Sequence, residues 1–230
     1  MTDRSGLPTG EEKARTVQAM FDRIAPRYDR LNRIMTFGMD AGWRRKSIAA
    51  LGLARGSSVV DVACGTGDFC RELQGADLDP IGFDVSFGML SMASVDAPLV
   101  QGDGLRLPLR DGGADGLTCG FAMRNVVELQ GLFEESARVL RRGGRAAFLE
   151  TAQPDNPILS FGHKVYFHKV VPRIGGWLSD KEAYSYLPKS TAYLPPKDEL
   201  TALLEGAGFD DVDVRFFGLG AVQLLTGTRS

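Results

Sequence analysis

The chain has 230 residues, of which 43% are hydrophobic and 24% are charged, and its formal net charge is -2. This is the composition of an ordinary soluble protein, long enough for one α/β domain with little left for a second. Without an excess of positive charge, nothing indicates nucleic acid as a partner. The three cysteines and two histidines show no zinc spacing, so we expect no metal and a reducing compartment.

No apolar run approaches the roughly 18 residues that a membrane-spanning helix needs, and residues 1–10 lack the apolar core of a signal peptide. We therefore expect a cytoplasmic protein. The first helix is predicted to start after Thr9, because Thr9 and Glu12 have the spacing of a capping box. Apolar residues recur at helical spacing from Val17 to Ile24, and Pro26 should end the helix.

A buried strand that runs into a glycine turn is predicted at residues 58–68. Ser58 to Val62 is apolar and β-branched, as a central parallel strand should be. Gly65 and Gly67 can adopt positive φ and bring the backbone close to a nucleotide-like ligand. The third glycine of the dinucleotide fingerprint is absent, since Cys70 occupies its place. A tight turn with no ligand stays open as the alternative.

Two acidic residues follow at the ends of further predicted strands. Asp84 closes a strand over residues 80–84, about 20 residues after the glycine turn, where a carboxylate can accept hydrogen bonds from ribose hydroxyls. Asp103 ends a third strand, at residues 98–103, and can equally be a solvated loop acid. Strand and helix patterns alternate between residues 57 and 150, which predicts a doubly wound, mostly parallel sheet with helices on both faces.

The fourth strand, at residues 117–121, leads into Arg124 and Asn125, which should face the ligand cleft beyond the carboxyl end of the sheet. Alternatively, Arg124 forms an ion pair with Glu128, four residues on. A helix at 132–140 and a strand at 146–150 come next, ending in Glu150, which is either a polar cleft group or a partner of nearby backbone donors.

Prolines and aromatic residues dominate residues 153–196 and suggest a segment outside the sheet, suited either to an apolar ring with a hydrophobic tail or to a packed helical cap. Residues 211–228 read as two strands around a glycine-rich turn, which predicts an antiparallel hairpin. The hairpin would complete a seven-stranded sheet with Rossmann-like topology.

The motif Asp61-x-Ala63-x-Gly65-x-Gly67, with Asp84 and Gly102-Asp103, resembles the class I S-adenosylmethionine-dependent methyltransferases. Within that class, residues 25–45 resemble a signature of the quinone-biosynthesis C-methyltransferases. Its matching positions are Tyr28, Asp29, Asn32, Thr36, Gly38 and Trp43, while Asp40 stands where many members carry histidine. Residues 138–150 and 184–190 resemble further family segments, so the resemblance covers nearly the whole chain. Gly120 and Ala122 depart from the family pattern, which often has serine and glycine there.

The resemblance implies C-methylation of a prenylated quinol, most simply demethylmenaquinol, with S-adenosylmethionine as cofactor. The residues it assigns to the cofactor are Asp61, Ala63, Gly65, Thr66, Gly67, Asp84, Val85, Asp103, Gly104 and Gly120. The catalytic candidates are Arg124, Asn125 and Tyr28, with Tyr166, His163 and His168 as weaker ones. A peripheral contact with the inner face of the membrane and a homodimer are further expectations.

The resemblance also divides the single domain into four segments. These are an N-terminal helical lid at 1–55, a cofactor-binding core at 56–150, a substrate-side insertion at 151–196 and a C-terminal helix with hairpin at 197–230. Three other functions stay open: methylation of another small phenol or quinone-like compound, S-adenosylmethionine binding without catalysis, and nicotinamide-dependent dehydrogenation. The last is disfavoured because the tyrosine–lysine pairs at 166/169 and 186/189 are three residues apart rather than four.

Overall fold

The computed structural model of the chain describes residues 9–154, 156–157, 160–162, 186 and 190–230. The described helices are α1 (Gly10–Ile24), α2 (Tyr28–Met35), α3 (Met39–Leu51), α4 (Asp68–Gly75), α5 (Phe87–Ser91), α6 (Leu129–Val139) and α10 (Lys197–Gly206). The strands are β1 (Ser58–Val62), β2 (Asp79–Asp84), β3 (Leu99–Gln101), β4 (Ala114–Gly120), β5 (Leu140–Thr151), β6 (Phe209–Phe217) and β7 (Val222–Arg229). Short 3₁₀ turns are η1 (Ala25–Arg27), η2 (Met123–Asn125), η4 (Thr191–Tyr193) and η5 (Gly218–Gly220).

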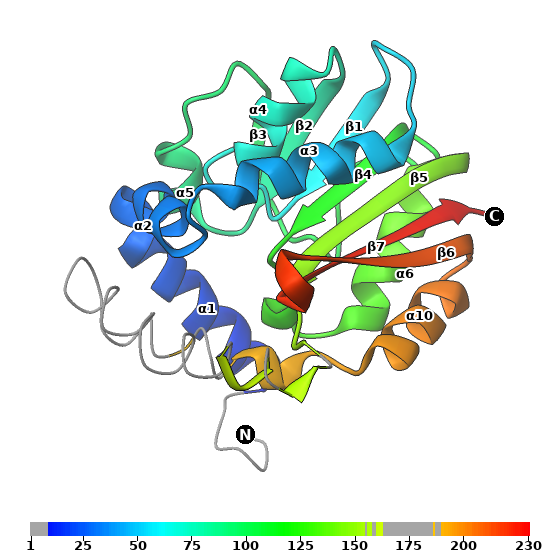
Figure 1. The fold of residues 1–230 in the computed structure, drawn as a ribbon. Helices are drawn as coiled ribbons and strands as arrows, with labels where there is room; N and C mark the ends of the chain where they lie inside the picture. The colour runs from blue at the N-terminus through cyan, green and yellow to red at the C-terminus, as the bar shows by residue number, and fades with distance from the viewer. Residues whose placement is uncertain (1–8, 155, 158–159, 163–185, 187–189) are drawn as a thin grey trace.

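The seven strands form one sheet in the order β3-β2-β1-β4-β5-β7-β6. β1 to β5 pair in parallel, whereas β7 runs antiparallel to both β5 and β6. The predicted mostly parallel, seven-stranded sheet with a terminal antiparallel hairpin is therefore confirmed. In Figure 1 the parallel strands point toward the side of the molecule where α1 and α2 lie, so ligands are expected at that end of the sheet.

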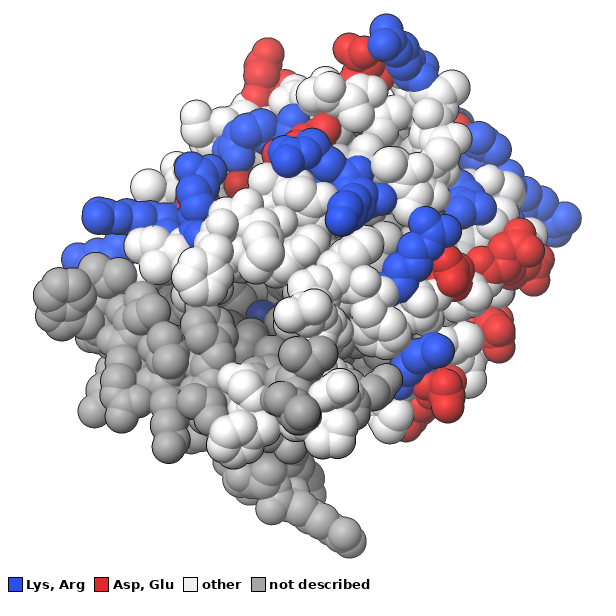
Figure 2. Space-filling view, viewed as in Figure 1, with Lys and Arg blue, Asp and Glu red and all other residues white. Residues whose placement is uncertain are grey.

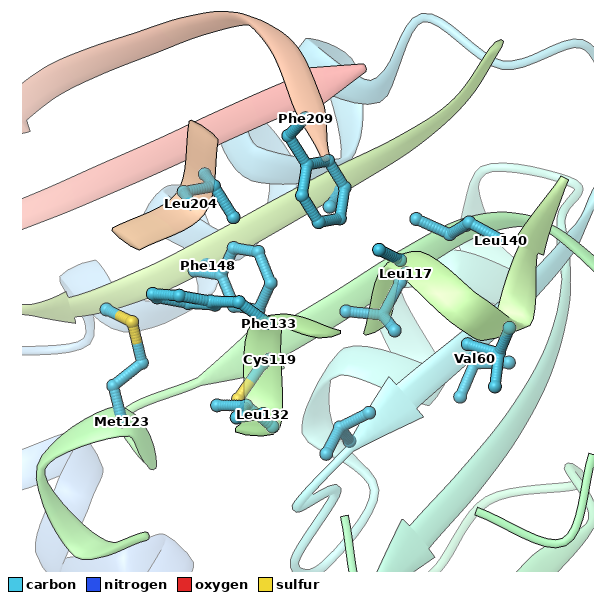
Figure 3. Close-up of a cluster of buried hydrophobic side chains, with 14 of the residues drawn as sticks. Val60, Leu117, Cys119, Met123, Leu132, Phe133, Leu140, Phe148, Leu204 and Phe209 are labelled. Atoms are coloured by element: carbon cyan, nitrogen blue, oxygen red, sulfur yellow. The ribbon is translucent and has the colours of Figure 1, made fainter. Parts of the chain in front are cut away.

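Helices cover both faces of the sheet, because successive residues of a buried strand point to opposite sides. Along β5, Ala146 and Phe148 face α6 and α10, while Ala147 and Leu149 face α3 and α4. The cluster on the α6 side is shown in Figure 3, where the rings of Phe133 and Phe148 meet edge to face at 5.0 Å between centroids. Each such fully buried side chain contributes about 1.5–3 kcal/mol through removal of apolar surface from water.

The N-terminal helices have a small core of their own. Met20, Ile24 and Leu31 are buried there, and Phe21, Tyr28, Met35 and Tyr186 pack against them. α1 begins directly after Thr9, as predicted, but the Thr9 side chain does not form the expected cap hydrogen bond with the first turn of the helix. The helix ends at Ile24, and Pro26 lies in the 3₁₀ turn that follows, because proline has no N–H to continue the helix.

The C-terminal hairpin contains an irregularity that affects the outer edge of the sheet. The pairing of β6 with β7 shifts between Asp210 and Asp213, and Asp211 has a φ of 51°. At the opposite edge, β3 has only three residues. The expected segment boundaries at residues 55/56 and 196/197 fall between elements, since α3 ends at Leu51, β1 starts at Ser58 and α10 starts at Lys197. Most of the expected insertion lies outside the described residues, and the single-domain interpretation stays a prediction.

Candidate active site

The turn after β1 combines three residues with left-handed backbone. Gly65 and Gly67 have φ values of 57° and 83°, and Ala63 adopts 55° although it carries a Cβ. A Cβ at Gly67 would come within 2.7 Å of Val95 Cγ1, so this glycine is required by a close approach as well as by its φ. α4 begins at Asp68. The strand therefore runs through an open turn into the N-terminus of a helix, as the sequence predicts.

Asp84, at the end of β2, is held against this turn. One carboxylate oxygen accepts a hydrogen bond from the Gly65 amide at 2.8 Å and the other accepts one from the Ser86 amide at 2.8 Å. The side chain is 9% exposed, and burial raises its pKa. Each carboxylate oxygen has two lone pairs, so both retain capacity for a further donor such as a hydroxyl group.

A cavity opens at the carboxyl ends of β1, β2 and β4. Nine of the thirteen predicted site residues line it: Tyr28, Ala63, Gly65, Asp84, Val85, Asp103, Gly104, Gly120 and Asn125. These residues come from six separate stretches of the chain, and the fold brings them together. The cavity contains the strand-end acid Asp84 and the glycine turn that the sequence predicts, together with apolar side chains.

Residues of α1 form a wall that sequence reasoning missed. Ala14, Val17, Gln18 and Phe21 line the cavity, and Gln18 Nε2 donates to the Val85 carbonyl at 2.9 Å. The signal in the sequence is the apolar face of this helix, which does not distinguish a packed surface from the wall of a cavity. It serves both purposes, since Val17 is buried against its neighbours and also borders the cavity.

Two carboxylates connect the N-terminal helices by hydrogen bonds to the turns that follow β1 and β2. Asp29 of α2 accepts a hydrogen bond from the Thr66 hydroxyl. Asp22 of α1 accepts from the Ser86 hydroxyl, and from the Gly88 amide at 2.9 Å. The Thr66 side chain therefore faces α2, and neither Thr66 nor Gly67 lines the cavity.

Asp61 lies inside the sheet and does not line the cavity either. It is 1% exposed and accepts hydrogen bonds from the Thr118 hydroxyl at 2.8 Å and from the Cys70 thiol at 3.5 Å. Burial raises the pKa of Asp61 to about 7, and the two hydrogen bonds offset part of that effect. Its side chain thus connects β1, β4 and α4 beneath the glycine turn, and its assignment to the cofactor stays a prediction.

Arg124 is 6% exposed and pairs with Glu150, which is fully buried at the end of the neighbouring strand β5. The alternative partner considered from the sequence, Glu128, is not the one observed. Glu150 also accepts from the Arg124 backbone amide at 3.3 Å and from the Thr151 amide at 2.7 Å. The Nε atom of Arg124 is buried and has no hydrogen-bond partner among the described residues.

Two phenols lie near this guanidinium. Tyr28 lines the cavity and its ring meets that of Phe21 at 5.9 Å, while the Tyr186 hydroxyl donates to the Asn125 side-chain oxygen at 3.3 Å. Burial raises the pKa of Tyr28 and of Tyr186, and the positive charge of Arg124 opposes the increase at both. Arg124 itself does not line the cavity but lies beside it. Tyr166, His163 and His168 are outside the described residues.

Arg44 of α3 is buried, and it follows Trp43, one of the positions that match the family signature. It pairs with Asp40 and with Asp68 at 3.0 Å, and its guanidinium lies over the Phe69 ring, 5.8 Å from the centroid. The pair with Arg44 lowers the pKa of Asp40 despite the opposing effect of burial. Asp40, in the place where many family members carry histidine, therefore has a structural partner in this chain.

The residues of the cavity fit a nucleoside. Asp84 offers hydrogen-bond acceptors for ribose hydroxyls, and the turn from Ala63 to Gly67 leads into the N-terminus of α4. Gly104 belongs to the same surface, and a Cβ there would come within 2.6 Å of Val62 Cγ1. Val62, Phe83 and Leu105 provide apolar surface for a planar base.

The fold and this cavity define a class I S-adenosylmethionine-dependent methyltransferase, a class whose methyl donor is S-adenosylmethionine. Two solved structures show the fold. A methyltransferase from Thermotoga maritima, described as a possible histamine N-methyltransferase, has a TM-score of 0.65 and 19% identity, covering 93% of this chain and 100% of its own. A methyltransferase from Methanococcus maripaludis has a TM-score of 0.65 and 15% identity, covering 92% and 94%.

The ubiE/COQ5 methyltransferase family matches residues 9–229, and the chain belongs to this family. A demethylmenaquinone methyltransferase of Roseiflexus castenholzii is 42% identical to it, over 97% of both chains. A ubiquinone/menaquinone biosynthesis C-methyltransferase of Syntrophotalea carbinolica is 39% identical, over 92% of this chain and 93% of its own. The predicted family and enzyme class are confirmed.

Proposed function

We propose that the protein methylates a ring carbon of a prenylated quinol, and that this quinol is demethylmenaquinol. The observation that supports the proposal most directly is the convergence of nine predicted residues on one cavity beside the buried Arg124. Relatives that match nearly the whole chain are named for demethylmenaquinone and for ubiquinone/menaquinone biosynthesis. Together they favour a quinol over another small phenol.

The cofactor would be held along the turn that follows β1, where Ala63 and Gly65 line the cavity. Asp84 would accept hydrogen bonds from the ribose hydroxyls, and its bonds to the Gly65 and Ser86 amides fix it in that orientation. Asp103 and Gly104 would lie beside the adenine, with Val85 and Gly120 completing the wall. S-adenosylmethionine supplies an electrophilic methyl group, so the protein mainly needs to position an electron-rich atom against it.

Arg124 would stabilise negative charge on the acceptor. Loss of a proton from a quinol hydroxyl makes the adjacent ring carbon electron-rich, and a cation near the oxygen favours the charged form. Among the described residues the buried Nε of Arg124 has no hydrogen-bond partner, and an acceptor oxygen that reached it would relieve the cost of an unpaired donor. Tyr28 and the Asn125–Tyr186 pair would orient the ring.

A prenylated acceptor implies contact with a membrane, and we include a peripheral contact in the proposal. None of the described helices is both long enough and apolar enough to cross a bilayer. A homodimer stays a prediction, which sedimentation equilibrium would test. Binding of the donor without catalysis is the remaining alternative, and its only support is the departure of Gly120 and Ala122 from the family pattern.

The proposal is tested with purified protein, S-adenosylmethionine labelled in its methyl group, and two acceptors: reduced demethylmenaquinone and its benzoquinol counterpart. We expect label in the naphthoquinol product, attached to a ring carbon by mass spectrometry and NMR. Label on oxygen would refute C-methylation. A faster reaction with a tailless phenol than with either quinol would refute the proposed acceptor, and tight donor binding without turnover on any acceptor would support the non-catalytic alternative.

A further inference from the structure

Two large apolar side chains stand at the tips of separate turns. Phe37, between α2 and α3, and Leu219, in the η5 turn of the hairpin, are each 76% exposed. Both have left-handed backbone, with φ values of 51° and 59°. Bulky residues seldom adopt this conformation, and large apolar side chains are usually buried rather than exposed to this extent. Both turns thus present an apolar residue where a polar one would cost less.

The two tips belong to one surface. Met39, which is 46% exposed, begins α3 two residues after Phe37. Trp43 lies one helical turn further along the same face. The hairpin packs on this tryptophan, since a Cβ at Gly218 would be 3.2 Å from Trp43 Cζ2. We call the set formed by Phe37, Met39, Trp43 and Leu219 the Phe37–Leu219 surface.

Positive charge lies beside the Phe37–Leu219 surface. Arg27, Arg30, Arg33 and Lys46 are exposed on α2, α3 and the turn before them, and Lys46 lies over the Phe217 ring at 5.1 Å. The two acids of residues 26–46 are turned inward: Asp29 accepts from Thr66, and Asp40 pairs with buried Arg44. In Figure 2, Lys and Arg side chains run along the region of α2 and α3, next to an uncharged surface that borders a hollow.

This local charge contrasts with the formal net charge of -2 for the whole chain. Apolar tips beside a row of cations match the interface of an anionic bilayer, where lipid headgroups attract the cations and the acyl region accepts the tips. Separate protruding side chains need no shape complementarity from a fluid partner, whereas a protein partner would need a matching surface. We propose that the Phe37–Leu219 surface docks the protein on an anionic lipid bilayer.

The position of this surface relates it to the candidate active site. Tyr28, at the start of α2, lines the cavity, and α2 ends at Met35, two residues before Phe37. η5 lies at the same end of the sheet in Figure 1. Under the proposed function, on which this step of the inference rests, docking through these tips would place the mouth of the cavity next to the bilayer that contains the prenylated acceptor.

The test measures co-sedimentation with vesicles of phosphatidylcholine alone and with added phosphatidylglycerol, at low and high salt. We expect binding only to the anionic vesicles, and loss of most of it at about 0.5 M salt, where charges are strongly screened. Phe37→Ser with Leu219→Ser removes the tips. Arg33→Glu with Lys46→Glu reverses two charges and should weaken binding roughly 20-fold or more. Arg55→Glu with Arg142→Glu, near the amino ends of β1 and β5, is the matched control and should bind like the natural protein.

Equal vesicle binding by the natural protein and both surface variants would overturn the inference, as would binding to neutral vesicles alone. A dimer in sedimentation velocity that disappears with Phe37→Ser and Leu219→Ser would assign the surface to a second copy instead. Thermal melting checks that each variant is folded. Turnover on a soluble, tailless quinol should be unchanged in the Phe37→Ser and Leu219→Ser variant, while turnover of acceptor embedded in vesicles falls. Absence of any quinol methylation would refute the proposed function and leave the vesicle result standing.

Discussion

Glu150 accepts hydrogen bonds from both the guanidinium and the backbone amide of Arg124, although 26 residues separate the two in the chain. The register of the sheet creates this pair, because β4 and β5 are neighbours and Gly120 lies opposite Leu149. Arg124 is thereby held at the carboxyl end of β4, beside the cavity rather than in its lining.

The first prediction separates the structural role of this pair from its chemical role. Arg124→Ala should cost about 3–5 kcal/mol of unfolding free energy, because it leaves Glu150 charged and buried without its partner. The double variant Arg124→Met with Glu150→Leu removes both charges and should recover most of that stability. If Arg124 stabilises a quinol oxyanion, the double variant should still turn over about 10²–10³-fold more slowly than the natural protein.

Urea unfolding and single-turnover rates on the same preparations check both expectations, with donor affinity as the control. Arg124→Lys should be intermediate in rate, since the ammonium keeps the charge but loses the planar fork. Near-normal turnover in the folded double variant would remove Arg124 from the chemistry.

The second prediction concerns donor binding. Asp84→Ala should weaken the affinity for S-adenosylhomocysteine by roughly tenfold to a hundredfold, because two charge-assisted hydrogen bonds to the ribose would be lost. Isothermal titration calorimetry measures this. Asp79→Ala, at the exposed start of the same strand, is the control and should bind normally. An unchanged affinity in the Asp84 variant would exclude that carboxylate from the site.

The third prediction follows from the raised pKa of Asp61, about 7 in the folded protein. Between its usual value and pH 7, the unfolded chain carries this carboxylate ionised while the folded protein keeps it protonated. At low pH this group therefore leaves the unfolding free energy undiminished. Above the usual pKa of an aspartate, the unfolding free energy falls by up to about 1.4 kcal/mol per pH unit until Asp61 also ionises in the folded protein.

Asp61→Asn removes this titration and can still accept from Thr118. The unfolding free energy of the variant should rise relative to that of the natural protein between about pH 4 and 7 and then stay level. Urea titrations of both proteins at several pH values provide the comparison. A difference that does not vary with pH would contradict the raised pKa.

The fourth prediction uses the left-handed backbone of Ala63. Ala63→Gly should stabilise the protein by up to about 1 kcal/mol, because glycine adopts that conformation without steric cost. Ala49→Gly, at an exposed position within α3, is the matched control and should destabilise by about the same amount. A loss of stability in both variants would show that the Ala63 backbone is not strained.

The fifth prediction explains why glycine replaces the serine that the family resemblance led us to expect at position 120. A Cβ there would come within 2.6 Å of Phe69 Cε2, so a side chain at position 120 would overlap the Phe69 ring. Gly120→Ser should cost about 1–3 kcal/mol through overpacking. Combining it with Phe69→Leu should cost less than the sum of the single changes, as measured in a double-mutant cycle. Additive costs would rule out the steric explanation.

The sequence was sufficient for elements with a strong local pattern. β1 begins at Ser58 and ends at Val62, as predicted, because an apolar β-branched run followed by two glycines permits little else. The partner of Arg124 was not predictable in the same way. Glu128 is the alternative partner that the sequence offers because four residues suit a helical contact, yet Arg124 lies in a 3₁₀ turn and α6 starts only at Leu129. Nor could periodicity show that Gln18 and Phe21 border a cavity, since an apolar helix face looks the same whether it packs or lines a site.

The irregular pairing near Asp211 has a consequence for how molecules of this protein meet. A row of unpaired backbone groups at the edge of a sheet can recruit a strand from another chain. In β6 the left-handed Asp211 breaks that row, and the exposed charges of Asp210, Asp213 and Arg215 would face any incoming strand. Since β3 at the other margin is only three residues long, neither side offers a template for intermolecular β-pairing, and the sheet is protected against growth into aggregates.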